Sequence, residues 1–140
     1  MLDLLNLPGI KPVDMYKESK ALIIVAVPEE VEVPLCEACK TPMHKHGTRK
    51  NRFSDTPLYM EPVRLEIQRP RFRCESCGKM AMPELNFLDD KRRSTKRLVD
   101  VIRQQCLSTT FRALAEQTGV AVNTVKNVAH DLIEELEQTV

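Results

Sequence analysis

The chain has 140 residues, which is enough for one ordinary domain or two small ones. Aromatic residues make up 4% and tryptophan is absent, so the composition does not indicate a single large hydrophobic core. No stretch approaches the roughly 20 apolar residues of a membrane span, and the N-terminus lacks the basic start of a secretory signal. These features exclude a membrane partner from the expected functions and predict a cytoplasmic protein.

The first half of the chain is predicted to be rich in β-structure. Residues 13–16 and 21–27 are expected to form two strands joined by a polar turn at 17–20. A second polar turn is expected at 49–51. Apolar and polar residues alternate over 63–67, which is typical of a half-buried strand. Pro70 is expected to interrupt strand pairing, so that residues 69–73 run along a sheet edge, and residues 80–88 are expected to link this part to the next.

Four of the five cysteines form two Cys-x-x-Cys pairs, Cys36/Cys39 and Cys74/Cys77. Each pair places two thiolates on one tight turn, and Gly78 supplies the conformational freedom that such a turn needs. Two turns that face each other make a tetrahedral cage for Zn²⁺, with no coordination position left open for chemistry. The spacing therefore predicts a structural zinc site whose ligands are these four cysteines.

Two other interpretations of the cysteines remain open, a disulfide framework and a thioredoxin-like redox motif. A redox motif needs one Cys-x-x-Cys in a βαβ setting, whereas here two of them flank β-like sequence. Metal-ligating cysteines also fit a reducing cytoplasm. His44 and His46 lie near the first pair and could assist metal binding. Because four thiolates already fill a tetrahedral site, we expect both histidines to face phosphate or solvent.

The hydrophobic period becomes helical from about residue 94. Ser94 is predicted to cap a first helix whose apolar face includes Leu98 and Ile102, with Cys106 as a core residue. A second, short helix begins near Phe111 and stops at Gly119. A third helix is predicted from residue 122 to residue 136, where apolar residues recur every three or four positions over four turns.

The second and third helices have the spacing of a helix-turn-helix. Ala115 is small enough for a helix crossing, Gly119 suits the turn, and Val125 and Val128 point inward. An ordinary helical hairpin with a solvated polar face is the alternative. We favour DNA reading, because the basic cluster at 91–97 supplies contacts to phosphate. The side chains predicted to face outward and read DNA are Asn123, Thr124, Lys126 and Asn127.

The charges are sorted along the chain although the net charge is only +1. Residues 1–37 have an acidic excess, residues 40–73 have a basic one, and a second basic cluster covers 91–97. A polyanion feels the local field and not the total charge, so this sorting indicates double-stranded DNA as a partner. The predicted phosphate contacts are Lys45, Arg49, Lys50, Arg52, Arg71 and Arg73 in the first half, then Arg92, Arg93 and Lys96.

Together these patterns predict an α+β protein of two parts. A small β-rich zinc ribbon with four cysteines is expected over residues 1–88, and a three-helix helix-turn-helix module over residues 89–140. Since zinc binding is coupled to folding at such sites, removal of the metal is expected to unfold residues up to about 88 and to spare the helices.

With these motifs in place, the chain resembles the N-terminal region of insertion-sequence transposases of the ISL-three type. The resemblance is carried by the first cysteine pair, by Asp55-Thr-Pro57, and most specifically by Arg71-Phe-Arg-Cys74, followed by the helix-turn-helix. It implies a region that binds the terminal inverted repeats of the element. It also implies that strand cutting and joining belong to a separate DDE domain, which is absent from these 140 residues, so the chain is not expected to be an enzyme.

Two other functions compete with this one. The first is a stand-alone zinc-binding helix-turn-helix regulator, such as a two-domain antitoxin or transcriptional repressor, whose N-terminal half would bind a protein. The basic surface at 40–73 argues against it. The second is zinc or thiol enzymology, which needs an open coordination position or a low-pKa thiolate. The final helix ends on acidic residues that oppose its dipole. We therefore expect it to continue into a further domain or against a partner, with self-association through this helix or the missing catalytic domain.

Overall fold

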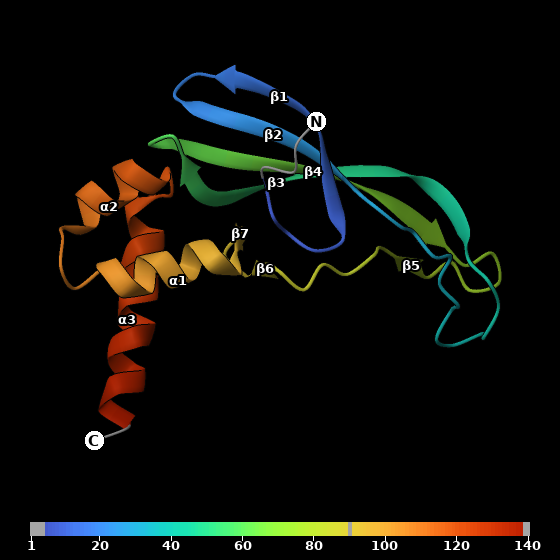
Figure 1. The fold of residues 1–140 in the computed structure, drawn as a ribbon. Coiled ribbons are helices and arrows are strands. Elements are labelled where there is room, and N and C mark those ends of the chain that lie inside the picture. Colours follow the sequence, from blue (N-terminus) through green and yellow to red (C-terminus); the bar gives the residue numbers. More distant parts are fainter. Residues whose placement is uncertain (1–4, 90, 139–140) are drawn as a thin grey trace.

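The computed structural model describes residues 5–89 and 91–138, and it is built from one sheet and three helices (Figure 1). This arrangement confirms the predicted α+β class. The strands are β1 (Ile10–Glu18), β2 (Ala21–Pro28), β3 (His44–Leu58), β4 (Glu61–Arg73), β5 (Met80–Ala81), β6 (Leu88–Asp89) and β7 (Ser94–Thr95). The helices are α1 (Lys96–Gln105), α2 (Phe111–Thr118) and α3 (Val122–Gln138).

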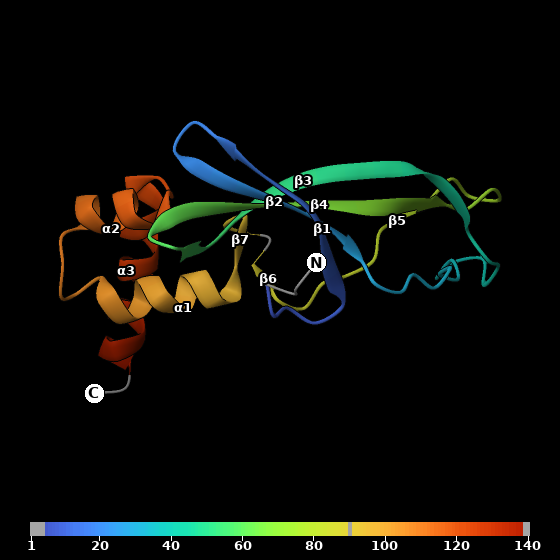
Figure 2. The ribbon, with the colours of Figure 1, turned by 45° about the horizontal axis from the view of Figure 1, so that its top comes forward.

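A long antiparallel hairpin of β3 and β4 forms the centre of the sheet, whose strand order is β1-β2-β4-β3-β7-β6. Strand β2 pairs with β4 in parallel, and β5 pairs with the end of β4. At about 3.3 Å per residue, the 13 residues of β4 extend about 40 Å. The helices lie at one end of this hairpin, and the segments that follow β2 and β4 lie at the other (Figures 1 and 2).

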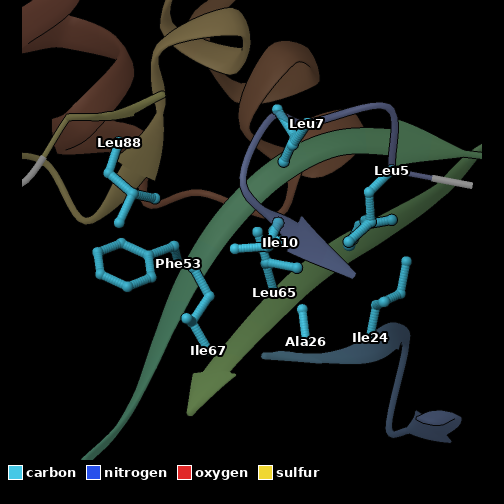
Figure 3. Close-up of a cluster of buried hydrophobic side chains, with 10 residues drawn as sticks. Leu5, Leu7, Ile10, Ile24, Ala26, Phe53, Leu65, Ile67 and Leu88 are labelled. Atoms are coloured by element: carbon cyan, nitrogen blue, oxygen red, sulfur yellow. The ribbon is translucent and has the colours of Figure 1, made fainter. Parts of the chain in front are cut away.

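The sheet has a hydrophobic core of its own along one face. Val63, Leu65 and Ile67 are buried while Arg64 between them is exposed, as the alternation predicts. Figure 3 shows side chains from β1, β2, β3 and β4 converging on this core. Its buried members are Leu5, Leu7, Ile10, Ile24, Ala26, Phe53, Val63, Leu65, Ile67 and Leu88.

Two predictions about strands are corrected by the pairing of β3 with β4. Residues 49–51 do not form a turn, because they pair with residues 67–69 inside the hairpin. Pro70 does not end β4 either, since it faces Thr48 across the hairpin. The neighbour β2 ends its pairing at Ile67, and β3 has a register shift between Lys45 and Thr48, so the missing N–H of the proline is tolerated there.

The helices follow the predicted pattern except at the first cap. Ser94 belongs to β7, opposite Ser54, and the hydroxyl of Thr95 caps α1 by accepting a 3.3 Å hydrogen bond from the N–H of Leu98. Helix α2 ends at Gly119, which has φ of 75°. As predicted, Cys106 is buried in the helical core. The core is made by Leu98, Val99, Ile102, Cys106, Leu114, Ala115, Val125, Val128 and Ala129.

A buried carboxylate joins the helices to the sheet. Asp55 on β3 is 1% exposed and accepts hydrogen bonds from the hydroxyl of Thr95 at 2.7 Å and from Nε of Arg97 at 2.8 Å. Arg97 also donates to the carbonyl of Leu5 at 2.6 Å. The sequence places Arg97 in a cluster that contacts phosphate, but its guanidinium is bound within the protein. Strand pairing also continues past residue 88, because β6 pairs with β7. The division of the chain at residue 88 stays a prediction.

Candidate metal centre and nucleic-acid interface

The four predicted ligands, Cys36, Cys39, Cys74 and Cys77, come together at the end of the hairpin away from the helices. Their sulfur atoms all lie within 4.8 Å of one another, and the Sγ atoms of Cys36 and Cys77 are 3.5 Å apart. A tetrahedral site with Zn–S bonds of about 2.3 Å places its sulfurs about 3.8 Å apart. The donor set and its spacing therefore fit Zn²⁺, as the sequence predicts.

Two similar turns present the cysteines. The N–H of Lys40 donates to the carbonyl of Cys36, and the N–H of Gly78 donates to that of Cys74, both at 2.8 Å. The residue after each pair has positive φ, 58° for Lys40 and 76° for Gly78. Glycine adopts this conformation readily, whereas a side chain makes it unfavourable. The second turn therefore suits its sequence better than the first.

The electrostatics of the cluster favour a bound cation. The backbone N–H of Cys39 lowers the pKa of Cys36, and that of Cys77 lowers the pKa of Cys74 to about 6. Hydrogen bonds with the side chain of Cys77, and also with that of Cys74, raise the pKa of Cys39 to about 12. The thiolate is the form that binds metal. Four thiolates this close need a cation such as Zn²⁺ to offset their charge.

The two histidines lie outside this cluster. Both are exposed on β3, and Nε2 of His44 is 3.7 Å from a carboxylate oxygen of Glu75. Within residues 5–89 and 91–138, the four cysteines are the group whose ligand atoms are close enough to hold a metal.

At the other end of the molecule, α2 and α3 meet through the turn at Gly119. The hydroxyl of Thr110 caps α2 by accepting from the N–H of Ala113 at 3.1 Å. On α3, Val125 and Val128 are buried in the helical core, as predicted. Of the four side chains predicted to face outward, Asn123, Lys126 and Asn127 are exposed, and Thr124 is half-buried.

Comparisons with known families match both the metal end and the helical end of the molecule. Residues 32–77 match the zinc-finger of transposase IS204/IS1001/IS1096/IS1165, and residues 83–133 match the helix-turn-helix domain of transposase family ISL3. The chain carries the zinc-ribbon and helix-turn-helix domains of ISL3-family transposases. The two matched regions are non-catalytic domains.

One curated relative supports the same assignment. The chain is 27% identical over 121 residues to the transposase for insertion sequence element IS1001 of Bordetella parapertussis. The aligned part covers 86% of this chain but only 30% of the relative, so the chain spans under a third of that transposase. No solved structure matches the chain. Among the described residues, no helix has the length and apolar character needed to cross a membrane.

The predicted phosphate contacts lie at the metal end, along the middle of the hairpin and at the helical end. Lys45 and Arg73 line a depression of about 400 Å³ beside the zinc site, together with both histidines. Arg49 and Lys50 are exposed in the middle of β3, and Arg71 is half-buried on β4. Arg93 and Lys96 are exposed near the start of α1.

Arg52 and Arg92 are already engaged by carboxylates. Arg52 forms ion pairs with Glu18 at 3.0 Å and with Glu66 at 3.3 Å, and its hydrogen bond lowers the pKa of Glu18. Arg92 pairs with Asp89 at 3.2 Å and also with Asp131 of α3. A phosphate that approaches either guanidinium would have to share it with these partners.

A basic cleft separates the sheet from the helix-turn-helix, and we define it by Arg52, Arg64, Arg92, Arg93 and Thr124. It has a volume of about 390 Å³ and includes the backbone of the turn at residues 119–121. A neighbouring hollow of about 1040 Å³ shares Arg52 and Arg64 and adds Lys20 and Arg112. The sequence did not single out Arg64, because it has the pattern of any exposed position of an alternating strand; only the fold places it beside the turn at Gly119 that precedes α3.

Proposed function

We propose that this region binds double-stranded DNA and recognises the terminal inverted repeats of its insertion element. The observation that carries the proposal is the position of the basic cleft beside the first turns of α3. There, Thr124 of α3 lines the same cleft as Arg52 and Arg64 of the sheet, and the exposed Asn123 precedes it in the first turn of the helix. A helix that reads bases needs cationic groups on the flanking phosphates to hold it in register.

Sequence reading is assigned to Asn123, Lys126 and Asn127. An asparagine amide can pair with an adenine edge, and a lysine can contact guanine or phosphate. Only the N-terminal part of a recognition helix reaches the bases. From Asp131 onward α3 is acidic, and phosphate would repel that part. Thr124 faces the basic cleft and is assigned to phosphate contact.

The zinc ribbon is proposed to make a second contact on the same duplex. Lys45 and Arg73 lie at the far end of the hairpin, whose strand β4 extends about 40 Å, which exceeds the roughly 34 Å of one DNA turn. The zinc ion would keep Lys45 and Arg73 in place at that distance. Strand cutting and joining would then belong to a DDE domain outside the two domains matched here.

Base reading is tested by titrating the protein with a terminal-repeat duplex and with a scrambled duplex. Asn127→Ala or Asn123→Ala is expected to cost roughly 1–3 kcal/mol on the repeat and little on the scrambled DNA. Gln138→Ala is the matched control, since it removes an exposed amide from the far end of the same helix. Equal losses on both duplexes would show that this face of α3 does not read bases.

Phosphate binding is tested by the dependence of affinity on salt. Neutralising Arg49, Lys50 and Arg52 together is expected to weaken binding to both duplexes alike. It should also reduce the slope of affinity against salt by about one counterion for each phosphate that these side chains neutralise. Arg103→Ala is the control, because Arg103 pairs with Glu135 away from the cleft. Unchanged binding by the triple variant would show that this part of β3 does not contact the DNA.

A further inference from the structure

The turn between β3 and β4 exposes two large side chains that the fold does not use. Tyr59 is 82% exposed and Met60 is 96% exposed, more than any other large apolar side chain in the described residues. Leu58 pairs with Glu61, so these two residues form the whole loop. We call this two-residue loop the hairpin tip.

The backbone of the hairpin tip is also unfavourable for its residues. Tyr59 has φ of 51° and Met60 has φ of 63°. A two-residue turn with positive φ at both positions strongly prefers Asn-Gly or Asp-Gly. Tyrosine and methionine adopt this conformation at a cost in stability. Since they neither suit the turn nor pack in a core, folding does not explain why they are here.

The hairpin tip is held beside the start of the recognition helix. Pro62, two residues after the tip, packs so closely on Gly119 that a Cβ atom there would lie 2.7 Å from the Cβ of Pro62. Arg64 then donates to the carbonyl of Gly119 at 3.2 Å. Glu61, the acidic neighbour of the tip, is neutralised by Lys17 at 2.5 Å. A duplex bound by α3 and the basic cleft would therefore pass close to the tip.

We propose that Tyr59 and Met60 insert into the bound DNA as a wedge beside the bases that α3 reads. Proteins that deform DNA place apolar side chains such as methionine between base steps, and an aromatic ring can stack on a base at a step opened in this way. The short turn fixes the backbone of both residues before binding, so only side-chain rotamer freedom is lost when they meet the duplex. This inference rests on the proposed function, because it requires that the region binds DNA.

The first test separates the role of the tip in binding from the stability of the turn. The double variant Tyr59→Asn with Met60→Gly supplies the residues that this turn prefers, so its melting temperature should rise by roughly 3–8 °C. Its affinity for a mixed-sequence 30-base-pair duplex at low salt should nevertheless fall roughly tenfold. Met15→Ala is the matched control, a methionine that is 43% exposed on β1. It should leave the affinity unchanged.

The second test detects stacking directly. The chain has no tryptophan, so the Tyr59→Trp variant carries a single fluorescent indole. Its emission should be quenched and protected from acrylamide when the same duplex is added, while that of a Met15→Trp variant should not change. These variants keep the zinc site and the helical core intact.

The outcomes distinguish this inference from the proposed function. If the unaltered protein binds no duplex, the proposed function fails, and the wedge with it. If the unaltered protein binds but the double variant binds equally well and the Tyr59→Trp emission is unchanged, only the wedge is overturned. Reduced self-association of the double variant, with normal DNA affinity, would also overturn it, because the tip would then bind protein and not DNA.

Discussion

The two ends of the long hairpin are stabilised in different ways. At the metal end, the buried cluster consists of Cys36, Met43, Phe72 and Cys74, so half of it is sulfur ligands. At the helical end, nine apolar residues from all three helices pack together. So small a set as the first cannot hold a fold without help. One end therefore depends on a cation, and the other depends on apolar burial.

The hydrophobic core of the sheet is a third cluster, separate from the metal end and from the helical core. Ile24, Leu65 and Ile67 are buried against one another without any cysteine. The expectation that chelation unfolds everything up to residue 88 takes no account of this core. We therefore expect the part of the chain whose folding depends on the metal to be confined to the segments around the two cysteine turns. The metal end, the sheet core and the helices should therefore respond separately to substitution.

The largest effect is expected from removing zinc, because binding free energy at such sites is on the order of 10 kcal/mol or more. Chelation, or Cys74→Ser, should expose the amides of residues 31–48 and 70–81 to hydrogen exchange. The sheet core and the helices should stay protected. Cys106→Ala is the control, since it removes a buried thiol from the helical core and should leave one zinc per chain. Uniform loss of protection would mean that the molecule is one cooperative unit.

The reverse experiment unfolds the helical end and leaves the metal end intact. Val125→Asp places an unpaired charge where the side chain is fully buried, which should cost about 4 kcal/mol or more and unfold the helices. Circular dichroism should show the helix loss, while metal analysis should still find zinc. Lys126→Asp, at the neighbouring exposed position, should keep the helices folded. Loss of zinc from the Val125 variant would contradict the independence of the two ends.

A smaller effect is expected at the junction of the helices with the sheet. Arg97→Ala leaves the buried carboxylate of Asp55 without its cation, which should cost about 3 kcal/mol. The helices should then melt at a lower temperature than the sheet, giving two transitions in calorimetry. Arg93→Ala, which removes an exposed arginine nearby, should leave the melting curve unchanged. A single, equally shifted transition for Arg97→Ala would argue against a separable junction.

The smallest effects should distinguish the two cysteine turns from each other. Lys40→Gly should stabilise the metal end by up to about 1 kcal/mol, because Lys40 has positive φ. Gly78→Ala should destabilise it by about 1 kcal/mol for the same reason. Competition for zinc with a chelator measures both. If both variants changed zinc affinity in the same direction, backbone conformation would not be the cause.

Much of this protein follows from local features of its sequence. The spacing of Cys36, Cys39, Cys74 and Cys77 predicts the metal cluster, because tight turns and a tetrahedral ion set that spacing. The helical period predicts the core of the three helices and the break at Gly119. These patterns depend on neighbours within a few residues, so the sequence carries them directly.

Only the tertiary structure decided features that depend on residues distant in the chain. Residues 49–51 form a strand because β4 supplies their hydrogen bonds, although their composition is that of a turn. Arg97 faces Asp55 instead of solvent because β3 brings that carboxylate beside α1. The basic cleft forms because Arg64, which alternation marks only as exposed, meets the turn at Gly119. A charge in a sequence has no partner until the fold provides one, so its role is settled by the fold.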